Sequence, residues 1–160
     1  MASRVDFGRL QWLFPIAVAL HNSEEAIWMP LWDARHAAEL PIRPPPAVEI
    51  RLALVLLTVA AFVITHFSSR RGPQSFWAYL LFGFIVTMLA NVFVPHVPAA
   101  IVFRSYAPGV VTAVVINLPL MTCLAVLAVR DEWVSGRKAV AFGVGVPLLG
   151  AAGISMLLSA

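Results

Sequence analysis

The chain has 160 residues, of which 61% are hydrophobic and only 12% are charged, and its mean hydropathy is +0.88. Soluble domains carry about 25% charged residues, so this composition excludes an ordinary soluble domain and predicts an integral membrane protein. The single cysteine, Cys123, excludes an internal disulfide framework and a cysteine-rich zinc site. The net charge of +3 is spread over loops, which argues against nucleic acid as a partner.

The sequence predicts an all-α bundle of five membrane spans in one domain, residues 1–160. Each span is an apolar run of roughly 20 residues, long enough to cross a bilayer. In chain order the spans cover about 11–32, 50–67, 76–94, 108–129 and 139–158. Four prolines within 41–46 rule out one continuous helix between the first two spans, although a short interfacial helix at 35–40 is expected. Pro95 is expected to follow the end of the third span, and Pro108 to lie in the first turn of the fourth.

Positive charge in the connections orients the bundle with its N-terminus inside and its C-terminus outside. The inner segments then hold Arg4, Arg9, Arg70, Arg71, Arg130, Arg137 and Lys138, and the outer ones hold Arg35, Arg43, Arg51 and Arg104. The first span has a signal-like Ala17-Val18-Ala19, but we expect it to be retained, because cleavage there would remove the anchor just before His21. The fifth span carries Gly143, Gly145, Gly150 and Gly153, which predicts close helix packing and a possible homo-oligomer.

An ionisable cluster, His21, Glu24 and Glu25, interrupts the apolar first span. A charge at the centre of a spanning helix costs about 2.5–3.5 kcal/mol on insertion scales, so these side chains must be protonated, paired, hydrated or bound to a cation. Their i, i+3, i+4 spacing places all three on one helix face. Glu25 lies one turn beyond His21 and should share its partner, whereas Glu24 should face a neighbouring helix.

Further polar residues reach the same depth when the five spans alternate in direction. Asn91 and His96 then lie towards the outer end of the third span, and Asn117 lies near the middle of the fourth. We expect Asn91 to be catalytic and to donate a hydrogen bond to Glu24. The substrate pocket is expected to be lined by Trp28, Thr87, Thr112 and Asn117. His66 should be excluded by depth, and His36 should lie in the outer connection.

Three chemical interpretations of the cluster remain open. His21, Glu25 and His96 could hold one divalent metal ion, zinc or iron, because histidine and carboxylate at helical spacing can bind one ion. Alternatively, His21, Glu24 and Glu25 could carry out metal-free acid–base catalysis, because two neighbouring carboxylates in a low dielectric are expected to share a proton. Thirdly, the cluster could only join helices as buried ion pairs.

The sequence resembles the HXXEE family of small bacterial multi-pass membrane proteins. The resemblance rests on His21-x-x-Glu24-Glu25 in the first span, on the stretch from Asn91 to His96, and on Tyr106-Ala-Pro-Gly-Val-Val-Thr112. It covers most of the chain, from about Trp12 to Arg130. The family name implies no activity, but it implies a bacterial inner-membrane location and supports the motif as the centre. The chain is also similar, by analogy only, to sterol isomerases related to emopamil-binding protein, which are small bundles with intramembrane histidine and glutamates.

These observations predict an integral membrane enzyme that acts on a hydrophobic small molecule drawn from the lipid bilayer. The reaction would be of isomerase, cyclase or hydrolase type, by acid–base or metal-assisted chemistry. The alternative is a binding or transport protein whose carboxylates carry a proton or a cation.

Overall fold

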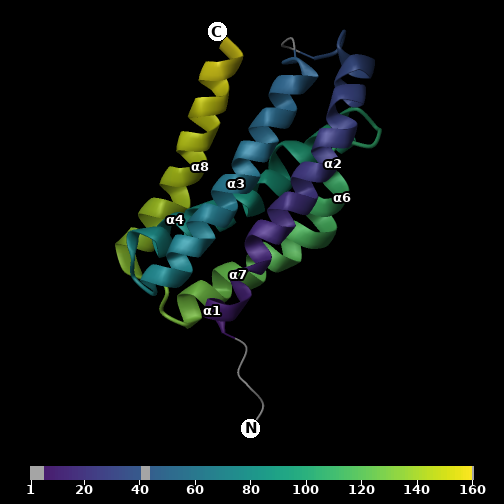
Figure 1. Ribbon diagram of the computed structural model, residues 1–160. Helices are drawn as coiled ribbons and strands as arrows, with labels where there is room; N and C mark the ends of the chain where they lie inside the picture. Colours follow the sequence, from purple (N-terminus) through teal and green to yellow (C-terminus); the bar gives the residue numbers. More distant parts are fainter. Residues whose placement is uncertain (1–5, 41–43, 160) are drawn as a thin grey trace.

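The computed structural model describes residues 6–40 and 44–159, and these residues form helices and no strands. The predicted all-α class is therefore confirmed. The long helices alternate in direction, and α8 ends at the opposite end of the bundle from α1 (Figure 1). The bounds in chain order are α1 (Phe7–Leu10), α2 (Leu13–His36), α3 (Ala47–Arg71), α4 (Phe76–Asn91), η1 (Val92–His96), α5 (Val97–Val102), α6 (Val110–Thr112), η2 (Ala113–Asn117), α7 (Leu118–Arg130) and α8 (Gly136–Ser159).

Three of these helices are long and apolar enough to cross a membrane. They are α3 and the two composite helices Phe76–Val102 and Val110–Arg130. This result supports a membrane protein. Of the other two long helices, α2 has the length to span but carries the ionisable cluster.

Several predicted helix ends are wrong, one of them because a proline does not stop its helix. The third span continues past Pro95 to Val102. The expected interfacial helix at 35–40 is instead the last turn of α2 followed by a turn. Pro108 lies outside the helix that it was expected to begin, since Gly109 is the N-cap. The predicted span 50–67 is also too short, because α3 runs from Ala47 to Arg71.

A kink in the third span turns His96 into the bundle. Pro95 has no N–H to donate to the preceding turn, and Val94 leaves the helical conformation, with φ −149° and ψ 111°. After this kink the chain resumes a helix at Val97. His96 is consequently only 3% exposed.

The hydrophobic core and the ionisable cluster occupy opposite halves of the bundle. Core residues come from the first half of α2, from the second half of α3, and from α4 and α7, which meet because the helices alternate in direction. They include Phe14, Ala17, Val18, Ala61, Ile64, Tyr79, Leu81, Ile85, Met121, Leu124 and Ala128. Packing in the apolar half therefore holds the helices together, and the ionisable side chains lie in the other half.

Small residues do bring α8 close to α4. A Cβ atom on Gly83 of α4 would lie 2.6 Å from Val146 Cγ2 and 2.8 Å from the Phe142 carbonyl oxygen. A Cβ on Gly143 would lie 3.3 Å from the ring of Phe82. By contrast, a Cβ on Gly145 or Gly150 would meet no atom within 4 Å in the part of the chain that the structure describes.

Candidate functional site

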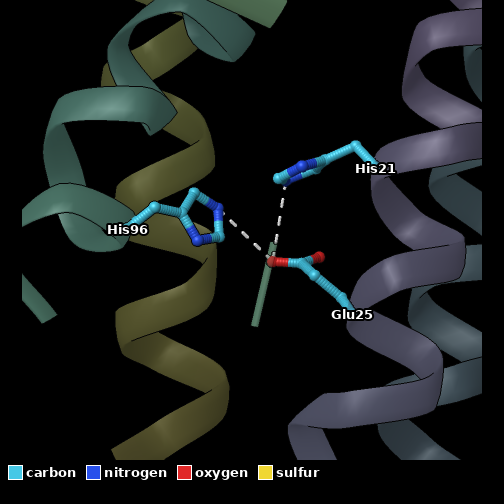
Figure 2. A group of neighbouring side chains, drawn as sticks. All are labelled: His21, Glu25 and His96. Atoms are coloured by element: carbon cyan, nitrogen blue, oxygen red, sulfur yellow. Dashed lines mark ion pairs between the residues drawn. The ribbon is translucent and has the colours of Figure 1, made fainter. Parts of the chain in front are cut away.

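Two histidines and one glutamate converge in the polar half of the bundle. His21 and Glu25 lie one turn apart on α2, and His96 faces them from η1 (Figure 2). Glu25 Oε1 lies 3.7 Å from His21 Nε2 and 3.5 Å from His96 Nε2. One potential ligand atom from each residue lies within 4.8 Å of those of the other two. The three side chains, buried together, form what we term the His–Glu–His centre.

The hydrogen bond of His96 fixes where its ring proton lies. His96 Nδ1 is 2.9 Å from the carbonyl oxygen of Pro108. A carbonyl oxygen only accepts, so Nδ1 must carry the proton and donate. In the neutral ring the lone pair is therefore on Nε2, the atom that faces Glu25.

Thr112 orients His21 in the same way. The Thr112 hydroxyl lies 2.6 Å from Glu24 Oε2, to which it donates, and 2.9 Å from His21 Nδ1. Because a hydroxyl has one proton, its oxygen accepts from His21 Nδ1–H. The Nε2 lone pair of His21 is thereby also directed towards Glu25.

Asn91 lies against both histidines and not against Glu24. Its Nδ2 is 2.9 Å from His96 Nε2 and 3.3 Å from His21 Nε2. The prediction that Asn91 donates to Glu24 is therefore wrong. The reason is the kink after Asn91, which brings His96 back over the amide.

Glu24 has a separate set of partners at the start of the fourth long helix. Its carboxylate accepts hydrogen bonds from Tyr106 Oη at 2.5 Å, from Val111 N at 3.3 Å, and from Thr112 N at 2.8 Å and Oγ1 at 2.6 Å. Four donors around one carboxylate suit its ionised form, which only accepts. Glu24 thus caps the free N–H groups of the Val110–Arg130 helix from α2.

The link between Tyr106 and Glu24 was not predicted from the sequence. Partial burial and the hydrogen bond to the Glu24 carboxylate raise the pKa of Tyr106. The phenol therefore stays protonated and remains a donor at neutral pH. A tyrosine shortly before a glycine and a threonine is a weak sequence signal for such a hydrogen bond.

Gly109 lies in direct contact with the His–Glu–His centre. A Cβ atom at this position would lie 2.6 Å from His96 Cε1, 2.8 Å from His21 Cε1 and 3.1 Å from Glu25 Cγ. The residue also has φ +81°, which glycine adopts without the strain of a side chain. Both the space and the backbone conformation therefore require glycine here.

A groove on the bundle surface borders Glu24. Glu24, Trp28, Tyr106 and Val111 line it, and its volume is about 440 Å³. Trp28 is 49% exposed and packs edge-on against Tyr106, with ring centroids 6.2 Å apart. This volume is large enough for a small apolar molecule.

Thr87 and Asn117 were also predicted to line the substrate pocket, but they do not line the groove. Thr87, one turn before Asn91 on α4, donates its hydroxyl proton to the Gly83 carbonyl oxygen at 2.9 Å. Asn117 is fully buried in η2, and neither polar atom of its amide finds a hydrogen-bond partner among the described residues. Their role in a substrate pocket stays a prediction.

Asn22 and His36 have structural contacts of their own. Asn22 Nδ2 donates to the Leu54 carbonyl oxygen at 3.0 Å and to Thr58 Oγ1 at 2.8 Å, which joins α2 to α3. His36 Nδ1 donates to the Trp32 carbonyl oxygen at 2.9 Å.

Comparison with known proteins supports the motif as the defining feature of the chain. The family model described as "Protein of unknown function with HXXEE motif" matches residues 12–124, which include the whole His–Glu–His centre. A relative, the uncharacterized protein YrkK of Bacillus subtilis (strain 168), is 34% identical over 108 residues, which are 67% of this chain and 66% of the relative. The chain thus spans just under two thirds of that relative's length. No solved structure matches the chain.

Proposed function

This chain belongs to the family of proteins of unknown function with an HXXEE motif, and we propose that it is an integral membrane enzyme with a metal centre. In this proposal His21, Glu25 and His96 hold one divalent ion, zinc or iron. The substrate is a lipid-soluble small molecule, and the reaction is of isomerase, cyclase or hydrolase type.

One observation carries the proposal: both histidines have their Nδ1–H groups engaged by oxygen acceptors. His96 donates to the Pro108 carbonyl and His21 donates to the Thr112 hydroxyl. Metal-binding histidines almost always use their second nitrogen in this way, which fixes the tautomer and the ring orientation. Thr112 extends the link to the Glu24 carboxylate, so the second glutamate of the motif supports the first histidine.

The two distances from Glu25 Oε1 to the histidine nitrogens are close to those expected around an ion. Two ligands at about 2.05 Å from a tetrahedral zinc are about 3.3 Å apart. The two Nε2 to Oε1 distances, 3.7 and 3.5 Å, exceed this by a few tenths of an ångström. A divalent ion held there would supply a Lewis acid.

Asn91 favours a second candidate, metal-free acid–base chemistry at the same residues. Its amide nitrogen is 2.9 Å from His96 Nε2, a hydrogen bond that occupies the lone pair without any ion. In this version Glu25 and the two imidazoles pass a proton to and from the substrate. Retention of activity in metal-free protein would select this candidate.

We further propose that α2 and α8 also span the bilayer, which gives five spans with the N-terminus inside a bacterial inner membrane. The 24 residues of α2 would extend about 36 Å, more than the apolar thickness of a bilayer. The open space beside Gly145 and Gly150 on α8 leaves room for a second copy of the chain to pack there.

Elemental analysis of the purified full chain tests the metal proposal. We expect about one equivalent of a transition metal, which is lost in His21→Ala and in His96→Ala. His66→Ala is the matched control, because His66 packs against Phe67 near the C-terminal end of α3 and is not part of the His–Glu–His centre. Wild-type protein without metal, or equal loss in the His66→Ala control, would overturn the proposal.

A further inference from the structure

A second pocket lies beside the groove, towards the end of α2. It has a volume of about 100 Å³, and its lining includes Trp28, Trp32, Arg35, His36, Ser105 and Tyr106. This is roughly three times the volume of a water molecule in the liquid. The pocket is therefore the size of a small polar group and not of a whole lipid.

The pocket and the groove are neighbours because they share Trp28 and Tyr106. On α2, Glu24, Trp28 and Arg35 are separated by four and seven residues, so they follow one another along one helix face. A single elongated molecule could therefore lie in both, with one end near Glu24 and the other near Arg35.

Two of the residues that line the pocket carry hydrogen-bond donors that lack acceptors among the described residues. Trp32 Nε1 is buried and has no hydrogen-bond partner in residues 6–40 and 44–159. The indole nitrogen can only donate, so the missing partner is an acceptor. Within the same described ranges, no carboxylate lies within 4.0 Å of the Arg35 guanidinium. The Ser105 hydroxyl is a further possible donor in the lining.

Aromatic rings hold Trp32 in this position. Its ring centroid lies 4.5 Å from that of His36 and 4.8 Å from that of Phe103. Tryptophan and arginine are the side chains that commonly lie at the level of lipid head groups. The position and the donors thus favour a charged head group over an uncharged one.

We propose that the pocket binds the anionic, oxygen-bearing head of a lipid, a phosphate or carboxylate, whose apolar part lies in the groove beside Glu24. Arg35 supplies the charge and the donors, and Trp32 Nε1–H supplies a directed hydrogen bond. As the substrate class of the enzyme proposed above, this inference rests on the proposed function. The lipid, and not a free anion, is favoured because an apolar groove continues directly from the pocket.

Native mass spectrometry of the full chain in a neutral detergent tests the proposal. The probes are dioleoyl phosphatidic acid, dioleoyl phosphatidylcholine and inorganic phosphate, so that the two lipids share their chains and differ in their heads. We expect phosphatidic acid to bind about tenfold more tightly than phosphatidylcholine, a difference of about 1.4 kcal/mol. Inorganic phosphate should not displace the lipid.

Two arginine variants separate the pocket from general surface charge. Arg35→Gln should abolish the preference for phosphatidic acid, and Trp32→Phe, which removes the indole N–H, should weaken it. Arg104→Gln should leave the preference unchanged. Arg104 is exposed and directly precedes Ser105, but it does not line the pocket. Equal binding of both lipids, equal effects of the two arginine variants, or displacement by inorganic phosphate would overturn the proposal.

The Glu25→Gln variant separates this inference from the proposed function. Glu25 is not in the pocket lining, so its variant should keep the lipid preference. Lipid preference in a protein that never binds metal would refute the metal centre alone. Metal binding without lipid preference would refute this inference alone.

Discussion

Glu24 and Glu25 are adjacent in the chain, and their carboxylates have different partners. Glu24 accepts four hydrogen bonds from Tyr106, Val111 and Thr112. Glu25 Oε1 instead faces the Nε2 atoms of His21 and His96 at 3.7 and 3.5 Å. Adjacent residues point about 100° apart around a helix. Glu24 therefore contacts a neighbouring helix, while Glu25 belongs to the His–Glu–His centre.

The two glutamates should therefore respond differently to the same substitution. Glu25→Gln keeps the shape of the side chain but removes the anionic ligand, so we expect an intact fold with loss of metal and activity. Glu24→Gln should lower the free energy of unfolding by about 1–3 kcal/mol, because an amide cannot accept from all four donors. Melting temperatures and metal contents of both variants check this. Full metal binding in Glu25→Gln would contradict the assignment.

Gly109→Ala should damage the His–Glu–His centre more than the fold. The added Cβ would lie 2.6 and 2.8 Å from the two imidazole Cε1 atoms, so at least one ring must move. Gly136→Ala is the control, because Gly136 also has a positive φ (+58°), but a Cβ added there would meet no atom of the described residues within 4 Å. Backbone strain, about 1–3 kcal/mol, should appear in both variants, and metal loss only in Gly109→Ala. Equal metal contents would show that the contact does not matter.

Thr112→Val should weaken metal binding without removing a ligand. The substitution deletes the hydroxyl that accepts from His21 Nδ1 and donates to Glu24. Loss of such an outer partner typically costs 10–100-fold in metal affinity or activity, and we expect about that range. Thr112→Ser, which keeps the hydroxyl, should bind metal nearly as well as the wild type. Competition with a chelator measures the affinities, and equal affinity of the Val and Ser variants would refute the link.

The orientation of the bundle can be tested at the two ends of the α2–α3 hairpin. In a background without Cys123, we expect Ser69→Cys to be labelled from the inside and Ala38→Cys from the outside by a membrane-impermeant thiol reagent. The basis is the positive charge of Arg70 and Arg71 beside Ser69. The reverse pattern would place the His–Glu–His centre in the inner half of the bilayer.

The sequence predicted the helical class and the shared face of the motif, because both depend on local periodicity. Apolar runs of about 20 residues mark long helices, and the i, i+3, i+4 spacing places His21, Glu24 and Glu25 together. Neither inference needs to know how the helices pack.

What the sequence could not predict depends on contacts between distant segments. His96 was expected to join His21 and Glu25, but the kink that turns it inward was not predicted, because Pro95 was expected to follow the end of a helix and the chain instead continues. The partners of Glu24 come from residues more than 80 positions away. The contact of Gly109 with both histidines likewise depends on packing, and a glycine in a loop carries no sign of it.

X-ray absorption spectroscopy of the purified, metal-loaded chain tests the His–Glu–His centre most directly. We expect two imidazole nitrogens and one carboxylate oxygen at about 2.0–2.2 Å from a zinc ion. One imidazole should be lost from the spectrum in His96→Ala. A metal surrounded by oxygen alone, or a spectrum unchanged in His96→Ala, would contradict a metal held by these three residues.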